Sequence, residues 1–417
     1  MFYRKTVLEN GITVISEPMD SVRSATLGIW FAVGSRDESP AEAGMSHFME
    51  HMMFKGTPTR SARDIAEQFD EMGALFNAET WKEHTAYHAR FVDSELPKAF
   101  EILADMVAHA NLDDESCALE REVVIEEIAR MEDDPDDQVH EIFESIVWPT
   151  HPLGLSTLGT RKTVGSFDHA QAVEFRSRHY LTGNAVVAAA GSLDHDELVR
   201  LTGELLGDLC AGPRAERTFA KPQSKAALSV MKKETEQAHI VYGTSTMSAS
   251  DPERFALYLM NGVLGGGMSS RLFQEIREKR GLVYSVGSMP ILFQDSGEFA
   301  VFAGSRPENV HKVLELIDEE TARMAAEGPT VEELDRARQA VVGQQVLGME
   351  STSSRMRRLG RGEVTGAEIL STDEVIDRFD SVTREHVAQI AGRVLTAPKV
   401  LSVVSPLAEG EFEKYIQ

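Results

Sequence analysis

The sequence is poor in the residues that several common kinds of protein require. Its 417 residues hold only two cysteines, Cys117 and Cys210, which argues against a disulfide framework and a cysteine metal site. No apolar stretch approaches the length of a membrane span, and the N-terminus lacks the apolar core of a signal peptide. Lysine and arginine number 42 against 67 aspartate and glutamate, and the resulting net charge of −25 would repel nucleic acid. We expect a cytoplasmic protein with neither a membrane nor a nucleic acid as partner.

The strongest positive signal is the stretch 46–56, which holds His47, Glu50 and His51. Two histidines four residues apart on a helix present both imidazoles on one face, as a zinc site requires. A glutamate in the same turn can take a proton from a metal-held water, so His-x-x-Glu-His is the inverted metalloprotease signature, that of the inverzincins. The pattern also arises by chance. Catalytic zinc needs three protein ligands, so the motif predicts a third elsewhere.

The segment 120–131 supplies a candidate for the third ligand. Four of its apolar residues recur at helical spacing and predict an inward face: Val123, Val124, Ile128 and Met131. Glu120 and Glu127 fall in the middle of this face, where a carboxylate needs a cation or strong donors as partners. We expect Glu127 to bind the metal and Glu120 to accept a hydrogen bond from a ligand imidazole. The alternative is that both glutamates pair with arginines.

The two motifs together resemble the pitrilysin/insulinase zinc peptidases, within them the branch of mitochondrial processing peptidase and its bacterial relatives. Glu127 lies 76 residues after His51 and closes a Glu-x6-Glu element, as in that family. The resemblance implies one zinc ion per chain, held by His47, His51 and Glu127. It also implies that Glu50 is the general base and that Glu120 supports a ligand histidine. Since the N-terminus is not rich in arginine and serine as a transit peptide is, we expect a bacterial protein.

Two further sets of residues matter only through the resemblance. It implies that Arg277 and Tyr284, seven residues apart, reach from the second domain to bind the substrate backbone and stabilise the tetrahedral oxyanion. Without it, Arg277 would be one charge among several on a solvated helix. The glycine run 265–267 lacks the context of a phosphate-binding loop and weakly resembles the family's glycine-rich substrate loop.

The stretch 76–81 predicts a strand, and the resemblance makes it a sheet edge to which substrate adds as another strand. Asn77, Ala78 and Thr80 would then bind substrate through main-chain hydrogen bonds, which implies broad specificity. The alternative is an ordinary edge strand. His84 and His88 are no alternative metal pair, because four residues along a strand span about 13 Å.

The length predicts two domains, and the buried-strand pattern of 181–193 recurs at 395–407. We expect a zinc-bearing domain over 1–210, a linker over 211–226, and a similar domain over 227–417 that lacks metal ligands and contributes substrate contacts. The helix 253–262, counterpart of the zinc helix, has no histidine. The predicted fold class is α+β, with two similar halves, each a mostly antiparallel sheet covered by helices, that form a clam-like cleft.

The predicted activity is that of a zinc endopeptidase acting on short or unfolded peptides. Members of this branch act in pairs, and a homodimer is the simpler expectation because this chain holds both the zinc motif and the Arg and Tyr. The alternatives are a heterodimer with a related subunit and a non-catalytic scaffold subunit. If the acidic run 132–137 faced the cleft, it would favour basic peptides, whereas a solvated surface is the simpler interpretation.

Overall fold

The computed structural model describes residues 2–214, 216–223 and 225–416, which form two compact units. Unit 1 comprises Met1–Ala129, Leu155–Thr218 and Leu347–Ile369. Unit 2 comprises Arg130–Gly154, Phe219–Val346 and Leu370–Gln417. Each unit therefore takes one helical segment from the other half of the chain. The predicted division into whole halves did not include this exchange, and the boundary at 211–226 stays a prediction.

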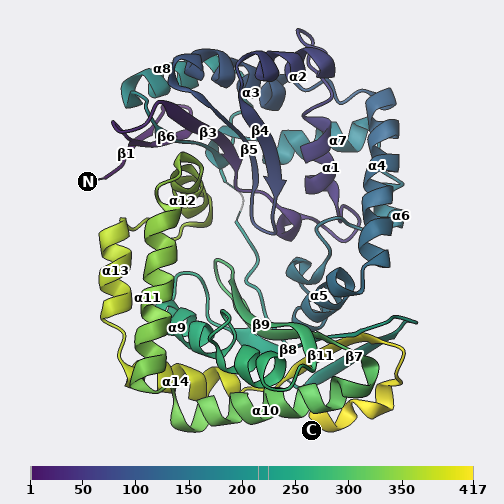
Figure 1. Ribbon diagram of the computed structural model, residues 1–417. Coiled ribbons are helices and arrows are strands. Elements are labelled where there is room, and N and C mark those ends of the chain that lie inside the picture. The colour runs from purple at the N-terminus through teal and green to yellow at the C-terminus, as the bar shows by residue number, and fades with distance from the viewer. Residues whose placement is uncertain (1, 215, 224, 417) are drawn as a thin grey trace. The chain divides into compact units, whose positions relative to one another are not determined.

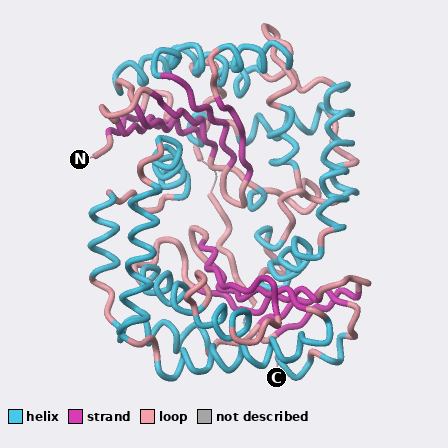
Figure 2. Tube along the Cα trace, viewed as in Figure 1, coloured by secondary structure: helices cyan, strands magenta, loops and turns pink. Residues whose placement is uncertain are grey.

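Unit 1 is built on a six-stranded sheet with the order β1-β2-β6-β3-β5-β4, coloured magenta in Figure 2. Its neighbouring strands are antiparallel except for the parallel pair β2 and β6. The strands are β1 (Arg4–Val7), β2 (Thr13–Pro18), β3 (Ser24–Phe31), β4 (Leu75–Thr80), β5 (Thr85–Val92) and β6 (Ala185–Gly191). The helices are α1 (Met45–Met52), α2 (Ala62–Glu71), α3 (Leu96–His109), α4 (Asp114–Asp133, ending in unit 2), α6 (Arg161–Val164), α7 (His169–His179), α8 (His195–Leu205) and α12 (Thr352–Thr365).

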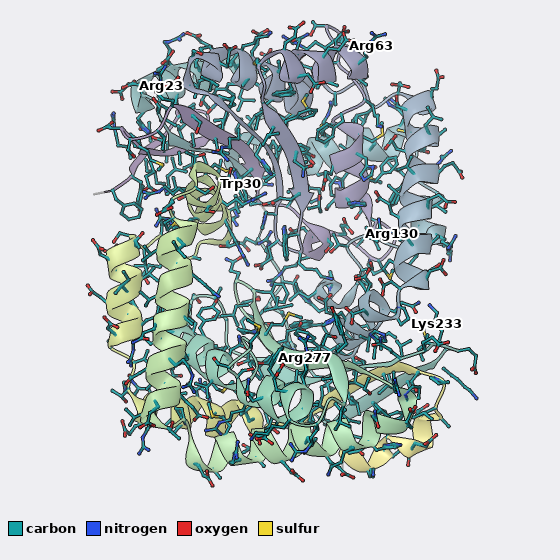
Figure 3. All side chains as sticks on the ribbon, viewed as in Figure 1. Arg23, Trp30, Arg63, Arg130, Lys233 and Arg277 are labelled. Carbon is teal, nitrogen blue, oxygen red and sulfur yellow. The ribbon has the colours of Figure 1, made fainter. Side chains whose placement is uncertain are left out.

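Side chains that alternate along the strands give the sheet of unit 1 two apolar faces. On β3, Leu27 and Ile29 belong to the core beneath α1, α3 and α8, whereas Trp30 belongs to the core beneath α12. Trp30, labelled in Figure 3, donates its indole N–H to the Met356 sulfur at 3.3 Å. Gly360 permits this approach, since a Cβ there would lie 2.3 Å from the indole ring. A helix of the second half thus completes the core of unit 1.

Unit 2 repeats the arrangement with a five-stranded sheet of order β7-β11-β8-β10-β9, in which only β7 and β11 are parallel (Figure 1). One face packs against α9, α10 and α14, and the other against α5. The strands are β7 (Ala227–Lys232), β8 (Ala238–Thr246), β9 (Val283–Leu292), β10 (Gly297–Ser305) and β11 (Val400–Ser405). The helices are α5 (Pro135–Val147), α9 (Arg254–Leu264), the π-helical η5 (Phe273–Glu278), α10 (Val310–Glu327), α11 (Val331–Gly348), α13 (Thr372–Asp380) and α14 (Arg384–Leu395).

Short 3-10 turns complete the backbone: η1 (Ser35–Asp37), η2 (Asp93–Glu95), η3 (Pro152–Gly154), η4 (Thr182–Asn184), η6 (Pro307–Asn309), η7 (Glu409–Glu411) and η8 (Glu413–Tyr415). The predicted α+β class with two similar, mostly antiparallel sheets is confirmed. Among the described residues, no helix combines the length and the apolar character that crossing a bilayer requires. The recurring pattern at 181–193 and 395–407 corresponds to β6 and β11, which hold equivalent places in the two sheets.

Candidate metal centre

The candidate centre begins with α1, whose start is capped from outside the helix. Gly44, at φ 94°, precedes α1 and has no side chain that could accept the free N–H groups of the first helical turn. The buried Glu38 carboxylate accepts the Gly44 N–H at 2.7 Å and the Ser46 N–H at 2.6 Å. Burial raises the pKa of Glu38 to about 7 against the lowering effect of these donors. Glu38 therefore holds the backbone from which His47 projects.

The apolar residues of α1 face the core and leave its histidines at the boundary between core and solvent. His47 and His51 lie with their ring centroids 4.7 Å apart. Glu127, from the neighbouring α4, places Oε2 at 3.6 Å from His47 Nε2 and at 3.5 Å from His51 Nε2. Among the described residues, these three form the one group of histidine, cysteine and acidic side chains whose ligand atoms lie within 4.8 Å of one another.

These distances suit a zinc ion held by His47, His51 and Glu127. Zinc binds nitrogen and oxygen at about 2.0–2.2 Å, so two donors of a tetrahedral site lie about 3.3 Å apart. The measured separations of 3.5 and 3.6 Å are close to that value and long for hydrogen bonds. Burial, with the nearby His51 second, lowers the pKa of His47 to about 4, which keeps its imidazole neutral as a ligand must be.

Glu120 lies behind His51 and takes no part in the group of three ligand atoms. Its Oε2 lies 3.0 Å from His51 Nδ1, and its Oε1 lies 2.6 Å from the Lys55 ammonium. The expected contact with an imidazole N–H is therefore present, and the buried carboxylate is paired with a lysine, not an arginine. Donation from Nδ1 leaves the Nε2 lone pair of His51 directed at the space before Glu127.

Glu50 lies on the same helix, and its carboxyl group is largely buried. Burial raises the pKa of Glu50, an effect that the Thr80 side chain and the charge of His51 oppose. Thr80 ends β4. A carboxylate with a raised pKa is suited to take and return a proton.

β4 is an end strand of the sheet of unit 1, paired within that sheet only with β5. Asn77 is exposed, Ala78 is buried and Thr80 is half-buried. The predicted edge strand is thus present, while its contact with substrate stays a prediction. His84 and His88 belong to no metal-capable group of described residues, and His88 instead contacts Arg357 at 3.2 Å.

Arg277 and Tyr284 lie in unit 2, on η5 and at the start of β9. The Arg277 guanidinium carbon lies 5.3 Å from the centre of the Tyr284 ring, so the structure brings these two predicted residues together. The acidic run 132–137 joins α4 to α5, where Asp134 caps α5 by accepting the Asp136 N–H at 2.9 Å. Its relation to substrate stays a prediction.

One predicted position is wrong, and two contributors are absent from the sequence prediction. Val123, expected on the inward face of α4, is 43% exposed, whereas Val124 is fully buried. Adjacent helical residues point about 100° apart, so both cannot lie at the centre of one stripe. Glu38 was missed, although Gly44 before a helix signals that the cap comes from elsewhere. Lys55 was missed, although it lies four residues after His51 at the end of the motif.

Comparison with known proteins agrees with the geometry. Residues 13–161 match the family described as "Insulinase (Peptidase family M16)", and residues 166–341 match "Peptidase M16 inactive domain". An uncharacterised zinc protease of Streptomyces coelicolor is 42% identical over 413 residues, covering 97% of this chain and 90% of that protein. The chain belongs to the insulinase (M16) peptidase family. Relatives in Streptomyces coelicolor and Bacillus subtilis are named as uncharacterised zinc proteases, which supports a zinc-dependent peptidase in general.

Solved structures with this fold include a protease and a chain of complex III2. A protease from Helicobacter pylori superposes with a TM-score of 0.91 at 21% identity, covering 97% of this chain and 99% of that one. A chain of complex III2 from Candida albicans gives 0.84 at 18% identity, with 99% of each chain covered. At such identities the likeness shows the fold alone. The function therefore has to be inferred from the side chains of the candidate metal centre.

Proposed function

We propose that this M16 protein is a zinc endopeptidase that hydrolyses short or unfolded peptides, with one zinc ion held by His47, His51 and Glu127. The observation that carries the proposal is the group of three ligand atoms from α1 and α4, all within 4.8 Å of one another. A zinc ion held by these residues would polarise the scissile carbonyl and lower the pKa of a bound water toward about 7. Glu120 orients His51 through the 3.0 Å contact with Nδ1.

Glu50 is the proposed general base. Its carboxylate takes the proton of the attacking water and delivers it to the nitrogen of the leaving amine. The raised pKa of Glu50 supports this role, because a stronger base accepts the proton more readily and still returns it.

The substrate contacts are proposed in both units. Asn77, Ala78 and Thr80 on the end strand β4 would bind the peptide backbone as an added strand, which places few demands on sequence. Arg277 and Tyr284 would donate hydrogen bonds to the peptide and to the oxyanion of the tetrahedral intermediate. We further propose a homodimer in a reducing compartment such as the cytoplasm, in which the unpaired Cys117 and Cys210 remain thiols.

Two rival functions use the same fold. One is a non-catalytic scaffold subunit, and the other is an enzyme active only with a related second subunit, which the "inactive domain" match of 166–341 favours. The complete His-x-x-Glu-His motif supports the catalytic proposal over the scaffold.

The test is to purify the chain alone and to measure its zinc content and its turnover of an unstructured peptide. The proposal expects about one zinc per chain and turnover by the single chain. Absence of zinc would support the scaffold, and zinc without turnover would support the obligate pair. The Glu50→Gln variant should keep zinc and lose on the order of 10²–10⁴-fold in kcat. Retained turnover would remove Glu50 from its proposed role.

A further inference from the structure

Arg277 lies in an irregular helix. In η5 the Lys279 N–H donates to the Gln274 carbonyl five residues earlier, at 3.0 Å, which is the π-helical pattern. The turn that follows η5 reaches Gly281, whose φ of +61° is a conformation that residues with side chains rarely adopt. A π-helical turn shifts the direction of the side chains that it carries, and such turns are frequent at functional sites.

Tyr284 lies in a matching irregularity of the strand that follows. β9 is an end strand, and its pairing with β10 skips Tyr284, because Gly304 lies opposite Ser285 and Ser305 lies opposite Val283. This β-bulge leaves Tyr284 78% exposed. Bulges at sheet edges redirect a side chain. Two departures from regular structure therefore meet at the Arg277 and Tyr284 pair.

The Arg277 guanidinium, labelled in Figure 3, also lies over a second ring. Its carbon is 4.7 Å from the centre of the Phe273 ring and 5.3 Å from that of Tyr284. Phe273 lies four residues before Arg277 on η5 and is half-buried. Both separations are within the range of attraction between a cation and an aromatic ring. A contact with an aromatic ring leaves the N–H donors of a guanidinium available to oxygen acceptors.

Several charged side chains of the segment around Arg277 already have ion-pair partners. Arg271 makes two contacts with Glu333, at 2.8 and 2.7 Å. Glu275 bonds to Lys279, and it lies 2.6 Å from Arg280. Within the part of the chain that the structure describes, Arg277 has no carboxylate at salt-bridge distance. The Arg277 guanidinium thus contacts aromatic rings, and its N–H donors are not bonded to a neighbouring carboxylate.

We propose that Phe273 is a positioning residue, whose ring holds the Arg277 guanidinium against Tyr284 so that its donors stay directed at the peptide backbone. An arginine side chain has several rotatable bonds, and fixing it in one arrangement costs conformational entropy. The Phe273 ring offsets part of that cost before substrate arrives, because it already holds the guanidinium in place. The inference rests on the proposed substrate role of Arg277 and Tyr284.

The test uses the Glu50→Gln variant, whose affinity for an unstructured peptide can be measured without turnover, together with kcat/KM in the chain that retains Glu50. Phe273→Leu should weaken peptide binding and lower kcat/KM roughly fivefold, the size expected of one cation–ring contact. Phe273→Tyr and Phe273→Trp should restore both values, since either ring can hold the guanidinium. Phe302→Leu, the same change at a half-buried position of β10, is the matched control and should leave both values unchanged.

A second comparison separates positioning from packing. In an Arg277→Ala background, Phe273→Leu should have no further effect on peptide affinity, because the residue that it orients is gone. Additive losses, failure of the aromatic variants to rescue, or a loss equal to that of the control would overturn the proposal. If Phe273→Leu does not fold, Phe273→Met supplies the same comparison. If Arg277→Ala binds the peptide with wild-type affinity, the proposed role of Arg277 is refuted. If the unsubstituted chain binds the peptide normally but does not hydrolyse it, only the proposed peptidase activity is refuted.

Discussion

The five strands of unit 2 repeat the order β2-β6-β3-β5-β4 of unit 1, but the two units differ in what the helix after the corresponding strands β3 and β8 carries. In sequence, α1 follows β3 in unit 1 as α9 follows β8 in unit 2, and both helices pack against their sheets. The first holds His47, Glu50 and His51, whereas α9 fills the equivalent place with apolar side chains: Phe255, Ala256, Leu257, Leu259, Met260, Val263 and Leu264. The same framework thus accommodates either a polar centre or a plain core, and the side chains decide which.

Buried glutamates in the two units have different partners. In unit 1, Glu120 contacts His51 and Lys55. In unit 2, Glu320 on α10 is buried and pairs with Arg323, and burial raises the pKa of its carboxyl group. Glu320 shows the arginine pairing that was the alternative for Glu120. A buried helical glutamate is therefore no sign of a metal site until its partners are known.

The largest expected effect follows from removing the proposed ligand of α4. Glu127→Ala should lower zinc affinity by more than about 100-fold, beyond the usual cost of losing a group that only supports a ligand. Turnover should be lost with the metal. Zinc content after dialysis and peptide hydrolysis are the measurements. The control is Glu126→Ala, an exposed neighbour on the same helix, and full zinc in Glu127→Ala would show that the centre does not need this carboxylate.

A smaller effect is expected from the groups behind His51. Glu120→Gln should weaken zinc binding roughly 10- to 100-fold, because a neutral amide is a weaker acceptor for the His51 N–H than the carboxylate that orients its ring. Lys55→Met should weaken it less, since Lys55 acts only through Glu120. Competition with a chelator gives the affinities. Glu320→Gln in unit 2 is the matched control, and an equal loss there would mean that the effect is one of general stability.

The buried Glu38 carboxyl group should make the free energy of unfolding depend on pH. Glu38→Gln should reduce the free energy of unfolding by about 1–3 kcal/mol near pH 5, because an amide cannot accept both the Gly44 and the Ser46 N–H. Burial raises the folded pKa of Glu38 from 4.5 to about 7, so its protonated form favours the native state. The wild type should lose that contribution, on the order of 3 kcal/mol, as pH rises from about 4.5 to about 7.

Denaturant unfolding of the wild type and Glu38→Gln at several pH values would measure this difference. The gap between the two proteins should narrow from about pH 5 and close or reverse by about pH 7, since glutamine does not titrate. A gap that is constant with pH would show that Glu38 does not change protonation in this range. Ser39→Ala, at an exposed neighbouring position, is a suitable control.

The sequence predicts the helices, the strands and the residues of the candidate centre better than it predicts how distant segments pack together. Periodicity and spacing placed His47, His51 and Glu127 on two helices, and the structure brings their ligand atoms together. Periodicity shows which face of a helix is apolar but not which sheet that face covers, so the exchange of α5 and α12 could not be derived. Glu38 and Lys55 act through contacts across a loop and with another helix, and the local pattern does not identify these partners.

The smallest expected effect distinguishes two adjacent valines of α4. Val123 is 43% exposed and Val124 is fully buried, although the apolar pattern alone assigns both to one face. Val124→Ala should cost about 1–2 kcal/mol in the free energy of unfolding through lost burial, and Val123→Ala should change it by less than about 0.5 kcal/mol. Denaturant unfolding of both variants measures the difference. Equal losses would mean that Val123 is covered in solution, as a homodimer through this face of α4 would require.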